Sequence, residues 1–366
     1  MTPIADHHRK AKGRTPQHLF LLTRAGAGSR MHPRITGENV VQRLASWCCL
    51  IAYALLGALA QAYAQGAQSY PDRPIRLIVA FSPGGATDVM TRQIADDLKA
   101  ALGQPVVVEN RPGANGFIAW SYIASSDPDG YTLLMAENAL AISPGLYKRP
   151  FDPVKQLDAV AFVATSPLVL VVGKDVKANN VAEFVALSRA TKSTTFSSAG
   201  IGSVAHLTFE AFKAGAGMEA MHVPYKGGGQ AIGDVVAGHI DANMAAISVG
   251  KSMIEGGKVK GLVVTSRERS PVLPDVPTLK EAGINTADVE LSFWWGIFAP
   301  AGLPDAVRAK LDKAVSTVTS DSRVRERLAK LDIEPAYAPA DVLKARLVND
   351  VANWSRFIAE HEIKAE

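Results

Sequence analysis

A glycine-rich turn between an apolar run and a helical pattern is the first feature of this sequence that could do chemistry. The stretch FSPGGATD, residues 81–88, follows the apolar run IRLIVAF and precedes an amphipathic pattern. A strand that passes through glycines into a helix N-terminus presents backbone N–H groups and the positive end of the helix dipole, and these bind anions. The turn lacks the Gly-Lys-Ser/Thr ending of a nucleotide-binding P-loop, so no lysine is placed on a phosphate.

The residues of this first glycine turn suggest binding through main-chain groups. Gly84 and Gly85 expose backbone N–H groups and permit positive φ, and Thr87 offers a hydroxyl. Asp88 is interpreted as compensating the helix dipole and bracing the loop, since as a general base it would stand beside an anion that it repels. The ligand-binding candidates in this turn are Ser82, Gly84, Gly85, Ala86, Thr87 and Asp88.

A second glycine turn, SSAGIGSVAH at 197–206, repeats the arrangement of the first. Ser203 is a candidate N-cap for the helix that follows. Two such turns suit a ligand with a negative group at each end, although both could also be purely structural strand-to-helix turns. His206 on that helix is either a packed residue or a ligand contact. The candidates here are Ser198, Gly200, Gly202, Ser203 and His206.

Further polar residues stand where ligands of open α/β sheets usually bind. Tyr225 and Lys226 lie in a third glycine turn, VPYKGGG, where the lysine could donate to a carboxylate or be a solvated loop charge. Asn138 and Ser248 follow expected strand ends and are also ligand-binding candidates. Glu137 is anomalous there, because an acid would repel an anion or would accept from a ligand amine or hydroxyl.

Catalytic and metal-binding patterns are missing from the sequence. It contains no Gly-x-Ser-x-Gly elbow, and the histidines after residue 64 show no metal-ligand spacing. We therefore expect no catalytic residue, no metal and no cofactor. Trp294 and Trp295 are interpreted as packing of a connecting strand and not as an aromatic platform for a sugar.

The N-terminal 64 residues differ from the rest in charge. They hold 8 of the 39 Lys and Arg but only 2 of the 35 acidic residues, so the remainder has 31 basic and 33 acidic residues, a net charge of −2. The overall charge of +4 therefore comes from this leader, and nothing after it favours a nucleic-acid partner. Both cysteines also lie in the leader, which excludes disulfides and cysteine metal sites from the rest.

The leader has the three parts of a secretory signal. Basic residues precede the apolar run at 47–64, which ends in the small-residue site Ala62-Tyr63-Ala64. We expect a signal peptide over 1–64, cleaved after Ala64, and an exported protein; a membrane anchor is the alternative. The basic part is too long if translation starts at Met1, so residues 1–30 could be a misplaced start before Met31.

After the leader, strand and helix patterns alternate. Apolar runs at 75–81, 105–110 and 131–137 are separated by helical patterns, which predicts a parallel, doubly wound sheet. The alternation restarts near residue 194, which indicates a second α/β lobe. Strands near 168–173 and 291–300 would connect the lobes as a two-strand hinge.

Seven blocks of this sequence carry a resemblance to a known family. In order they are YPDRPIRLIVAFSPGGATD, VVVENRPGANG, DPDGYTLLM, SSAGIGSVAHL, VPYKGGGQAI, RSPVLPDVPTLKEAGI and GIFAPAGLP. The chain from about residue 70 resembles the Bug-type substrate-binding receptors of tripartite tricarboxylate transporters. The resemblance implies a type II periplasmic binding protein, with lobe 1 formed by 70–170 plus 293–366 and lobe 2 by 171–292.

The resemblance also implies a function. We expect a periplasmic, monomeric receptor that captures a small organic carboxylate between two lobes and delivers it to membrane transporter subunits. The family's ligands include di- and tricarboxylates, acidic amino acids and aromatic carboxylates. Two alternatives stay open: a receptor that reports its ligand to a two-component sensor kinase, and an α/β hydrolytic enzyme, against which the missing catalytic groups argue.

Overall fold

The computed structural model describes residues 70–148, 151–286, 289 and 291–365. These residues all belong to one contact-defined unit of the chain, Ala62–Glu366. The expected signal peptide, its cleavage site and the alternative start lie outside the described residues. Within the described ranges, no helix has the length and apolar character needed to cross a membrane.

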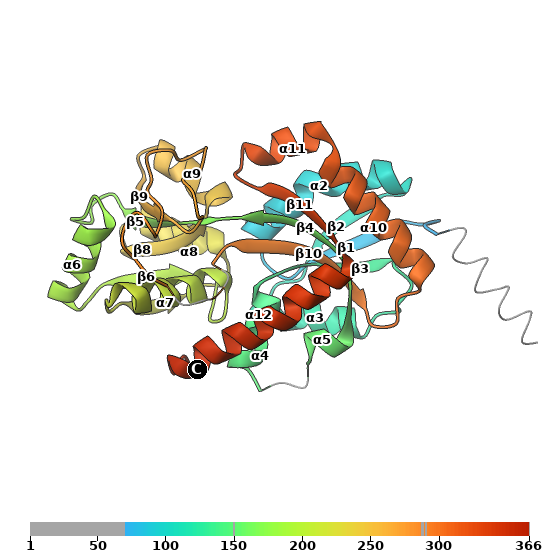
Figure 1. The fold of residues 1–366 in the computed structure, drawn as a ribbon, viewed down its shortest axis with the longest axis horizontal. Helices are drawn as coiled ribbons and strands as arrows, with labels where there is room; N and C mark the ends of the chain where they lie inside the picture. Colours follow the sequence, from blue (N-terminus) through green and yellow to red (C-terminus); the bar gives the residue numbers. More distant parts are fainter. Residues whose placement is uncertain (1–69, 149–150, 287–288, 290, 366) are drawn as a thin grey trace, which may run out of the picture. The chain divides into compact units, whose positions relative to one another are not determined.

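A six-stranded sheet with the order β11-β4-β10-β3-β1-β2 forms the larger lobe (Figure 1). Its strands are β1 (Ile75–Val79), β2 (Val106–Asn110), β3 (Thr132–Glu137), β4 (Leu157–Ser166), β10 (Phe293–Pro300) and β11 (Glu334–Pro339). β1 pairs in parallel with β2 and β3, as the sequence predicted, but β10 is antiparallel to β3 and β4, and β11 is antiparallel to β4. The parallel arrangement expected for the first three strands is thus confirmed, whereas β10 and β11 run opposite to β1, β2, β3 and β4, because β10 brings the chain back from the other lobe.

A five-stranded sheet with the order β7-β6-β8-β5-β9 forms the smaller lobe. β6 pairs in parallel with β7 and β8, and β5 is antiparallel to β8 and β9. Its strands are β5 (Leu168–Gly173), β6 (Thr195–Ser198), β7 (Met221–Pro224), β8 (Ala242–Ala246) and β9 (Val259–Val264). The fold is thus an α/β protein of two lobes, each built on its own mixed sheet.

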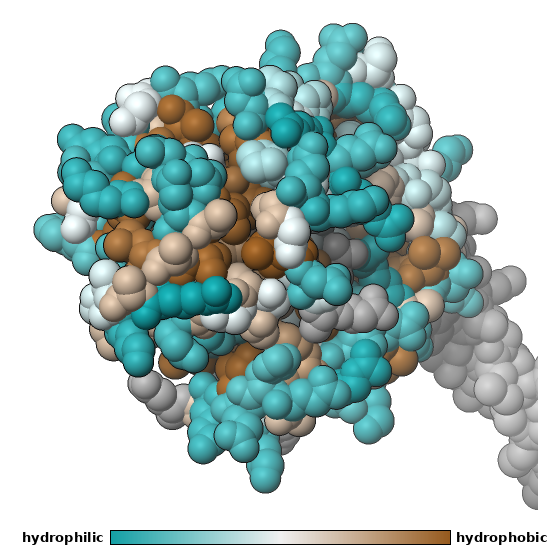
Figure 2. Space-filling view, turned by 60° about the vertical axis from the view of Figure 1, so that its left-hand side comes forward, coloured by the Kyte–Doolittle hydropathy of each residue, from teal (hydrophilic) through white to brown (hydrophobic). Residues whose placement is uncertain are grey.

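Helices cover both sheets (Figure 1). The large-sheet lobe carries α2 (Ala86–Leu102), α3 (Phe117–Ala124), α4 (Ala139–Leu146), α5 (Pro153–Gln156), α10 (Asp305–Ser320), α11 (Ser322–Ala329) and α12 (Ala340–Glu360), with a 3-10 turn at Ala114–Gly116. The small-sheet lobe carries α6 (Val181–Thr191), α7 (Val204–Ala216), α8 (Gly228–Val236) and α9 (Ile247–Glu255). Figure 2 brings the small-sheet lobe forward and shows a mostly hydrophilic surface with apolar residues in its middle.

Helix α2 shows how the sequence forms the elements that position the site. Met90, Ile94 and Leu98 recur every four residues, so one stripe of the helix is buried against the sheet. Gly103 ends the helix in the left-handed region at φ 74°, and its N–H donates to the Lys99 carbonyl at 2.9 Å. The start of α2 is thereby fixed directly after the first glycine turn.

The large sheet is packed on both faces. Along β1, Leu77 and Val79 belong to one apolar cluster and Ile78 to the other, since successive side chains of a strand point to opposite faces. The first cluster includes Met90 of α2, and the second includes Trp120 of α3. The carboxyl ends of β1 and β3 are thus held between two helical layers.

Two connecting segments join the lobes. β4 belongs to the large sheet and β5 to the small one, and only Pro167 separates them. A proline has no N–H to donate to a ladder, which suits the point where a strand leaves one sheet for another. The chain returns through β10, whose Trp294 and Trp295 are fully buried, in line with the packing role expected for them.

Asn138 clamps the returning segment. Its Nδ2 donates to the Ser292 carbonyl at 2.9 Å, and its Oδ1 accepts from the Trp294 amide at 2.9 Å. The side chain is fully buried. It therefore ties the end of β3 to the start of β10, next to the hinge.

Replacing the clamp should cost stability. Asn138→Ala leaves the buried Trp294 amide without its acceptor, which costs roughly 1–3 kcal/mol of unfolding free energy. Urea unfolding measures this, with Asn349→Ala on the exposed side of α12 as a matched control that should change stability by less than about 0.5 kcal/mol. Equal stability of the two variants would show that the clamp contributes nothing.

Candidate functional site

A pocket lies between the lobes at the end of β3. Its cavity volume is about 60 Å³. The large-sheet lobe lines it with Phe81, Ser82, Gly85, Ala86, Thr87, Glu137 and Phe293. The small-sheet lobe lines it with Ala199, Ser203, Val204, Ala205, Gly227, Gly228, Ile232, Asn243, Met244, Ala245, Ala246 and Val249.

Three helix N-termini meet at this pocket. Gly85, Ser203 and Gly227 are the N-cap residues of α2, α7 and α8, and all three line it. The first amides of a helix have no intrahelical acceptor, and they add to the positive end of the helix dipole. Among the described residues we find no acceptor for the amides of five residues that line the pocket: Ala86, Thr87, Val204, Ala205 and Gly228.

The first glycine turn is braced by Asp88. The Gly84 amide donates to Asp88 Oδ2 at 3.0 Å, while Arg92 Nε and Asn110 Nδ2 donate to Oδ1 at 2.9 Å each. Burial alone would raise the pKa of Asp88, but these hydrogen bonds from Arg92, Gly84 and Asn110 outweigh it and lower that pKa. The carboxylate is thus ionised and its contacts hold the turn at its base, while Gly85 and Ala86 line the pocket.

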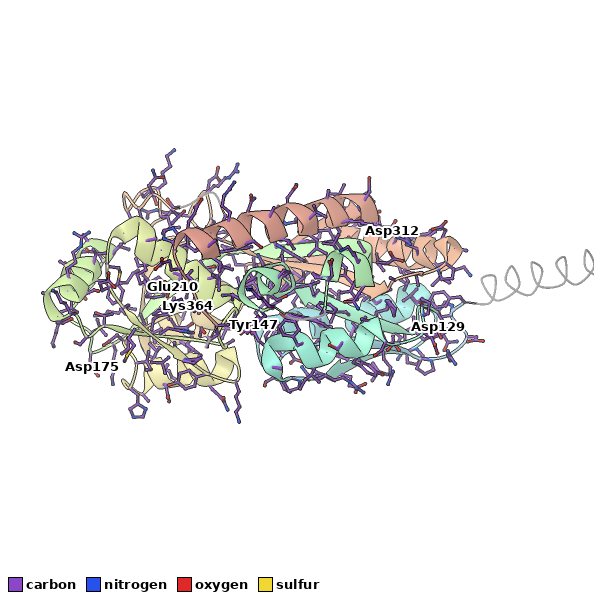
Figure 3. The ribbon with its side chains drawn as sticks, turned by 90° about the horizontal axis from the view of Figure 1, so that it is seen from below. Asp129, Tyr147, Asp175, Glu210, Asp312 and Lys364 are labelled. Atoms are coloured by element: carbon purple, nitrogen blue, oxygen red, sulfur yellow. The ribbon has the colours of Figure 1, made fainter. Side chains whose placement is uncertain are left out.

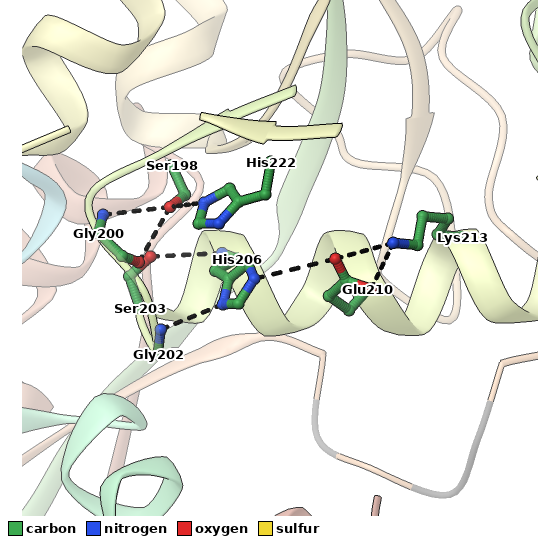
Figure 4. A network of polar contacts seen from close by, with 8 residues as sticks. All are labelled: Ser198, Gly200, Gly202, Ser203, His206, Glu210, Lys213 and His222. Atoms are coloured by element: carbon green, nitrogen blue, oxygen red, sulfur yellow. Dashed lines mark hydrogen bonds and ion pairs between the residues drawn. The ribbon is translucent and has the colours of Figure 1, made fainter. Parts of the chain in front are cut away.

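The second glycine turn is braced by a pair of histidines (Figure 4). The Gly202 amide donates to His206 Nδ1 at 3.1 Å, so that nitrogen carries no proton and the ring is neutral. The ring stacks on His222 with centroids 3.9 Å apart, and Ser198 Oγ lies 2.7 Å from His222 Nε2. Burial holds the pKa of His206 well below 6.5 and lowers the pKa of His222 to about 4. Ser203 Oγ caps α7 by accepting from the His206 amide at 3.3 Å.

The structure brings together some of the residues predicted from sequence and separates others. Ser82, Gly85, Ala86, Thr87 and Ser203 line the pocket. Gly200, Tyr225 and Lys226, with Ser82 again, line an adjoining hollow of about 470 Å³. Gly84, Asp88, Asn138, Ser198, Gly202, His206 and Ser248 line neither. Ligand contact stays a prediction for all of these residues, those that line the pocket included.

Several lining residues were missed from the sequence. Glu137 was noted as anomalous and not chosen, and Phe293, Ile232, Met244 and Val249 form apolar wall that no local pattern distinguishes from core. Asn243 lies in β8, where its Nδ2 donates to the Ser197 carbonyl at 2.8 Å. The sequence could have indicated Asn243 as a site residue, because it is a single asparagine in an otherwise apolar strand.

The lobes touch where the second glycine turn meets the end of α4. Tyr147 at the end of α4 donates its hydroxyl to the Ile201 carbonyl at 3.1 Å, and Figure 3 shows this tyrosine where the two lobes meet. A Cβ added to Gly202, whose φ is +81°, would lie 2.8 Å from side-chain atoms of Asn115 and Leu146 in the other lobe. The two lobes are therefore in direct contact at this turn.

No metal centre is found among the described residues, where no three His, Cys, Asp or Glu side chains gather as metal ligands. The lining of the pocket also holds no lysine, arginine or histidine. Positive potential in this pocket thus comes from backbone amides.

Comparison with known proteins agrees with this geometry. Residues 90–363 match the sequence profile of the tripartite tricarboxylate transporter family receptor. The chain is 34% identical over 298 residues to BugT of Bordetella pertussis, which covers 80% of this chain and 91% of BugT.

Three solved structures are also similar. The periplasmic binding protein BugD superposes with a TM-score of 0.77 at 31% identity, over 81% of this chain and all of BugD. Rpa4515 of R. palustris with adipate gives 0.77 at 28% identity, over 81% of this chain and 99% of that one. MatC of Rhodopseudomonas palustris with malate gives 0.71 at 31% identity, over 78% and 99%.

The buried histidine pair should make the free energy of unfolding depend on pH. The unfolded chain binds a proton at His222 near pH 6.5, whereas the folded chain binds it only near pH 4, so stability falls as the pH falls through this range. Between pH 7 and pH 5 this histidine should cost roughly 2 kcal/mol of unfolding free energy.

Urea unfolding at both pH values tests this expectation. His222→Gln removes the titrating ring and should show a smaller loss than wild type. His239→Gln, which replaces an exposed ring, should keep the wild-type dependence. An unchanged loss in His222→Gln would contradict the neutral buried pair.

Proposed function

The chain belongs to the tripartite tricarboxylate transporter receptor family, and on that premise we propose that it captures a small organic carboxylate between its lobes and delivers it to a transporter in the cytoplasmic membrane. Three helix N-termini, two from one lobe and one from the other, point unpaired amides into one pocket. This single observation supports an anionic ligand that bridges the lobes.

The ligand class follows from the pocket and from the family. Adipate and malate, the molecules named with two of the similar structures, are both dicarboxylates. We propose that one carboxylate of such a ligand occupies the inner pocket and meets amides of α2, α7 and α8. Its other end extends toward the outer hollow, where Lys226 offers a positive charge. An acidic amino acid or an aromatic carboxylate fits the same scheme.

We also propose roles for the predicted site residues, the bounds of the two lobes, and the location and oligomeric state of the protein. The predicted ligand-binding residues act as a set in which some contact the ligand and others, such as Asp88 and His206, hold the glycine turns. We move the first lobe boundary from the expected residue 170 to Pro167, since β5 begins at Leu168 and pairs within the small sheet, and we keep the second boundary before Phe293. The mature protein is a periplasmic monomer that holds its ligand whole and breaks no bond.

A thermal-shift panel tests carboxylate binding. Malate or adipate at about 100 times its dissociation constant should add roughly 2.7 kcal/mol of stability. The corresponding diamides are matched controls that should add little, because they carry no negative charge for the helix N-termini. Equal stabilisation by acid and diamide would overturn the proposal.

Closure can be tested at Gly202. Gly202→Val should weaken binding of the stabilising acid tenfold or more, because its side chain must displace Asn115 and Leu146 of the other lobe before the lobes can close. The matched control is Gly257→Val, which has a similar φ of +65° but nothing within 4 Å of its Cβ.

Calorimetry gives both affinities, and small-angle scattering should show that only the Gly257 variant contracts with ligand. Similar binding by the two variants would mean that closure over the ligand is not required.

A further inference from the structure

Glu137 is a buried carboxyl group with an unusual place. It ends β3, lines the pocket and is 7% exposed. It is the one side chain with an ionisable group among the residues that line the pocket within the described part of the chain. A carboxyl group at a site that favours anions needs an explanation.

The hydrogen bonds of Glu137 have a fixed direction. Trp295 Nε1 can only donate, and it donates to Thr87 Oγ1 at 3.1 Å. The hydroxyl of Thr87 is therefore free to donate in turn, and it donates to Glu137 Oε2. For the second carboxyl oxygen, Oε1, the described residues supply no partner. Thus one oxygen is held as an acceptor, and the other is available to whatever occupies the pocket.

Within the described parts of the chain, no cation faces Glu137 from the elements around it. On α2, Asp88 and Arg92 bind each other and Asn110. On β10, the neighbours are Phe293 and Trp295. The lining from the small-sheet lobe has no charged side chain.

Beyond the lining, the ionisable groups near the start of α7 are either neutral or already paired. His206 and His222 are neutral above pH 6.5, since burial lowers the pKa of each. Glu210 is paired with Lys213 at 2.7 Å. An ionised Glu137 would therefore lose its hydration with no ion pair in return.

The two states of Glu137 differ in what they do to a bound anion. Burial raises the pKa of this carboxyl to about 7, and the hydrogen bond from Thr87 offsets only part of that rise. An ionised Glu137 would repel a ligand carboxylate and compete with it for the same helix N-termini. A neutral Glu137 has an O–H that can donate to the ligand through Oε1.

We propose that Glu137 is a specificity-determining residue that carries a proton in the complex and donates it as a hydrogen bond to the ligand carboxylate. The proposal rests on the proposed function and deepens it. Ligand binding above neutral pH then takes up one proton from solvent, with no bond broken in ligand or protein. The site selects a carboxylate at this point and disfavours an ammonium group, which would need the ionised form.

The expected signature is a pH dependence of affinity with a defined sign. Below neutral pH Glu137 is already protonated, so affinity changes little. Above neutral pH binding must supply the proton, so affinity should be about tenfold weaker at pH 8 than at pH 6. A merely structural glutamate would not make ligand binding take up a proton.

Calorimetry with malate and adipate on the mature protein tests this, at pH 6 and pH 8 and in buffers of different ionisation enthalpy. Wild type should show the tenfold change and should take up close to one proton at pH 8. Glu137→Gln keeps the shape and a donor, so it should bind with an affinity that is independent of pH. Glu326→Gln, at an exposed position of α11, should behave as wild type.

Every other result of these experiments contradicts either the role of Glu137 or the receptor function. Three outcomes would overturn the role of Glu137 and leave the receptor function intact. Wild type could bind equally at both pH values, wild type could bind more tightly at pH 8, or Glu137→Gln could keep the pH dependence of wild type. If Glu137→Gln does not fold, proton uptake by wild type decides alone. No binding of either acid at either pH overturns both proposals.

Discussion

The unpaired amides at the starts of α2, α7 and α8 constrain the rest of this structure. A buried N–H group without an acceptor is costly, and these amides belong to residues that line the pocket between the lobes. The chain supplies them with no acceptor among the described residues, so the proposed ligand would supply the missing acceptors. The two sheets, the hinge and the glycine turns all serve to bring these three helix ends to one place. A ligand that satisfies amides from both lobes stabilises closure by its better fit to the closed state.

Several polar residues near the pocket hold the backbone and do not line it. Asp88 accepts from the Gly84 amide, His206 accepts from the Gly202 amide, and Asn138 clamps β10. Gly84 and Gly202 both have positive φ, a conformation that side-chain-bearing residues rarely adopt. Their amides are therefore pinned by side chains four residues later, which leaves the following amides free for a ligand. The sequence alone therefore does not tell whether a polar residue beside a glycine turn binds a ligand or holds the backbone of the turn, because both roles require the same hydrogen-bonding groups.

Local patterns predicted the elements whose apolar residues repeat regularly, and missed those that depend on distant contacts. The apolar runs expected at 75–81 and 168–173 correspond to β1 and β5. α4 was missed because it contains Pro144, and it packs so closely that a Cβ on Gly145 would meet Ile358 of α12. β11 was missed because it holds two prolines, which an edge strand tolerates. Strand direction was also beyond the sequence, since pairing of β10 with β3 joins segments more than 150 residues apart.

Thr87 shows why the chemistry of the site needs the tertiary structure. From the sequence, the Thr87 hydroxyl was expected to bind a ligand. In the structure it accepts a hydrogen bond from Trp295 Nε1 and donates one to Glu137 Oε2. Residues from three distant segments thus fix one hydrogen-bond direction that no spacing reveals. With no lysine or arginine in the lining, the attraction for an anion comes from rigid backbone dipoles. Such groups lose little conformational freedom on binding, whereas a long cationic side chain would have to be ordered for each ligand. In the proposed receptor, opening of the hinge would separate the dipoles of α2 from those of α7 and α8 and so weaken their combined attraction for the ligand.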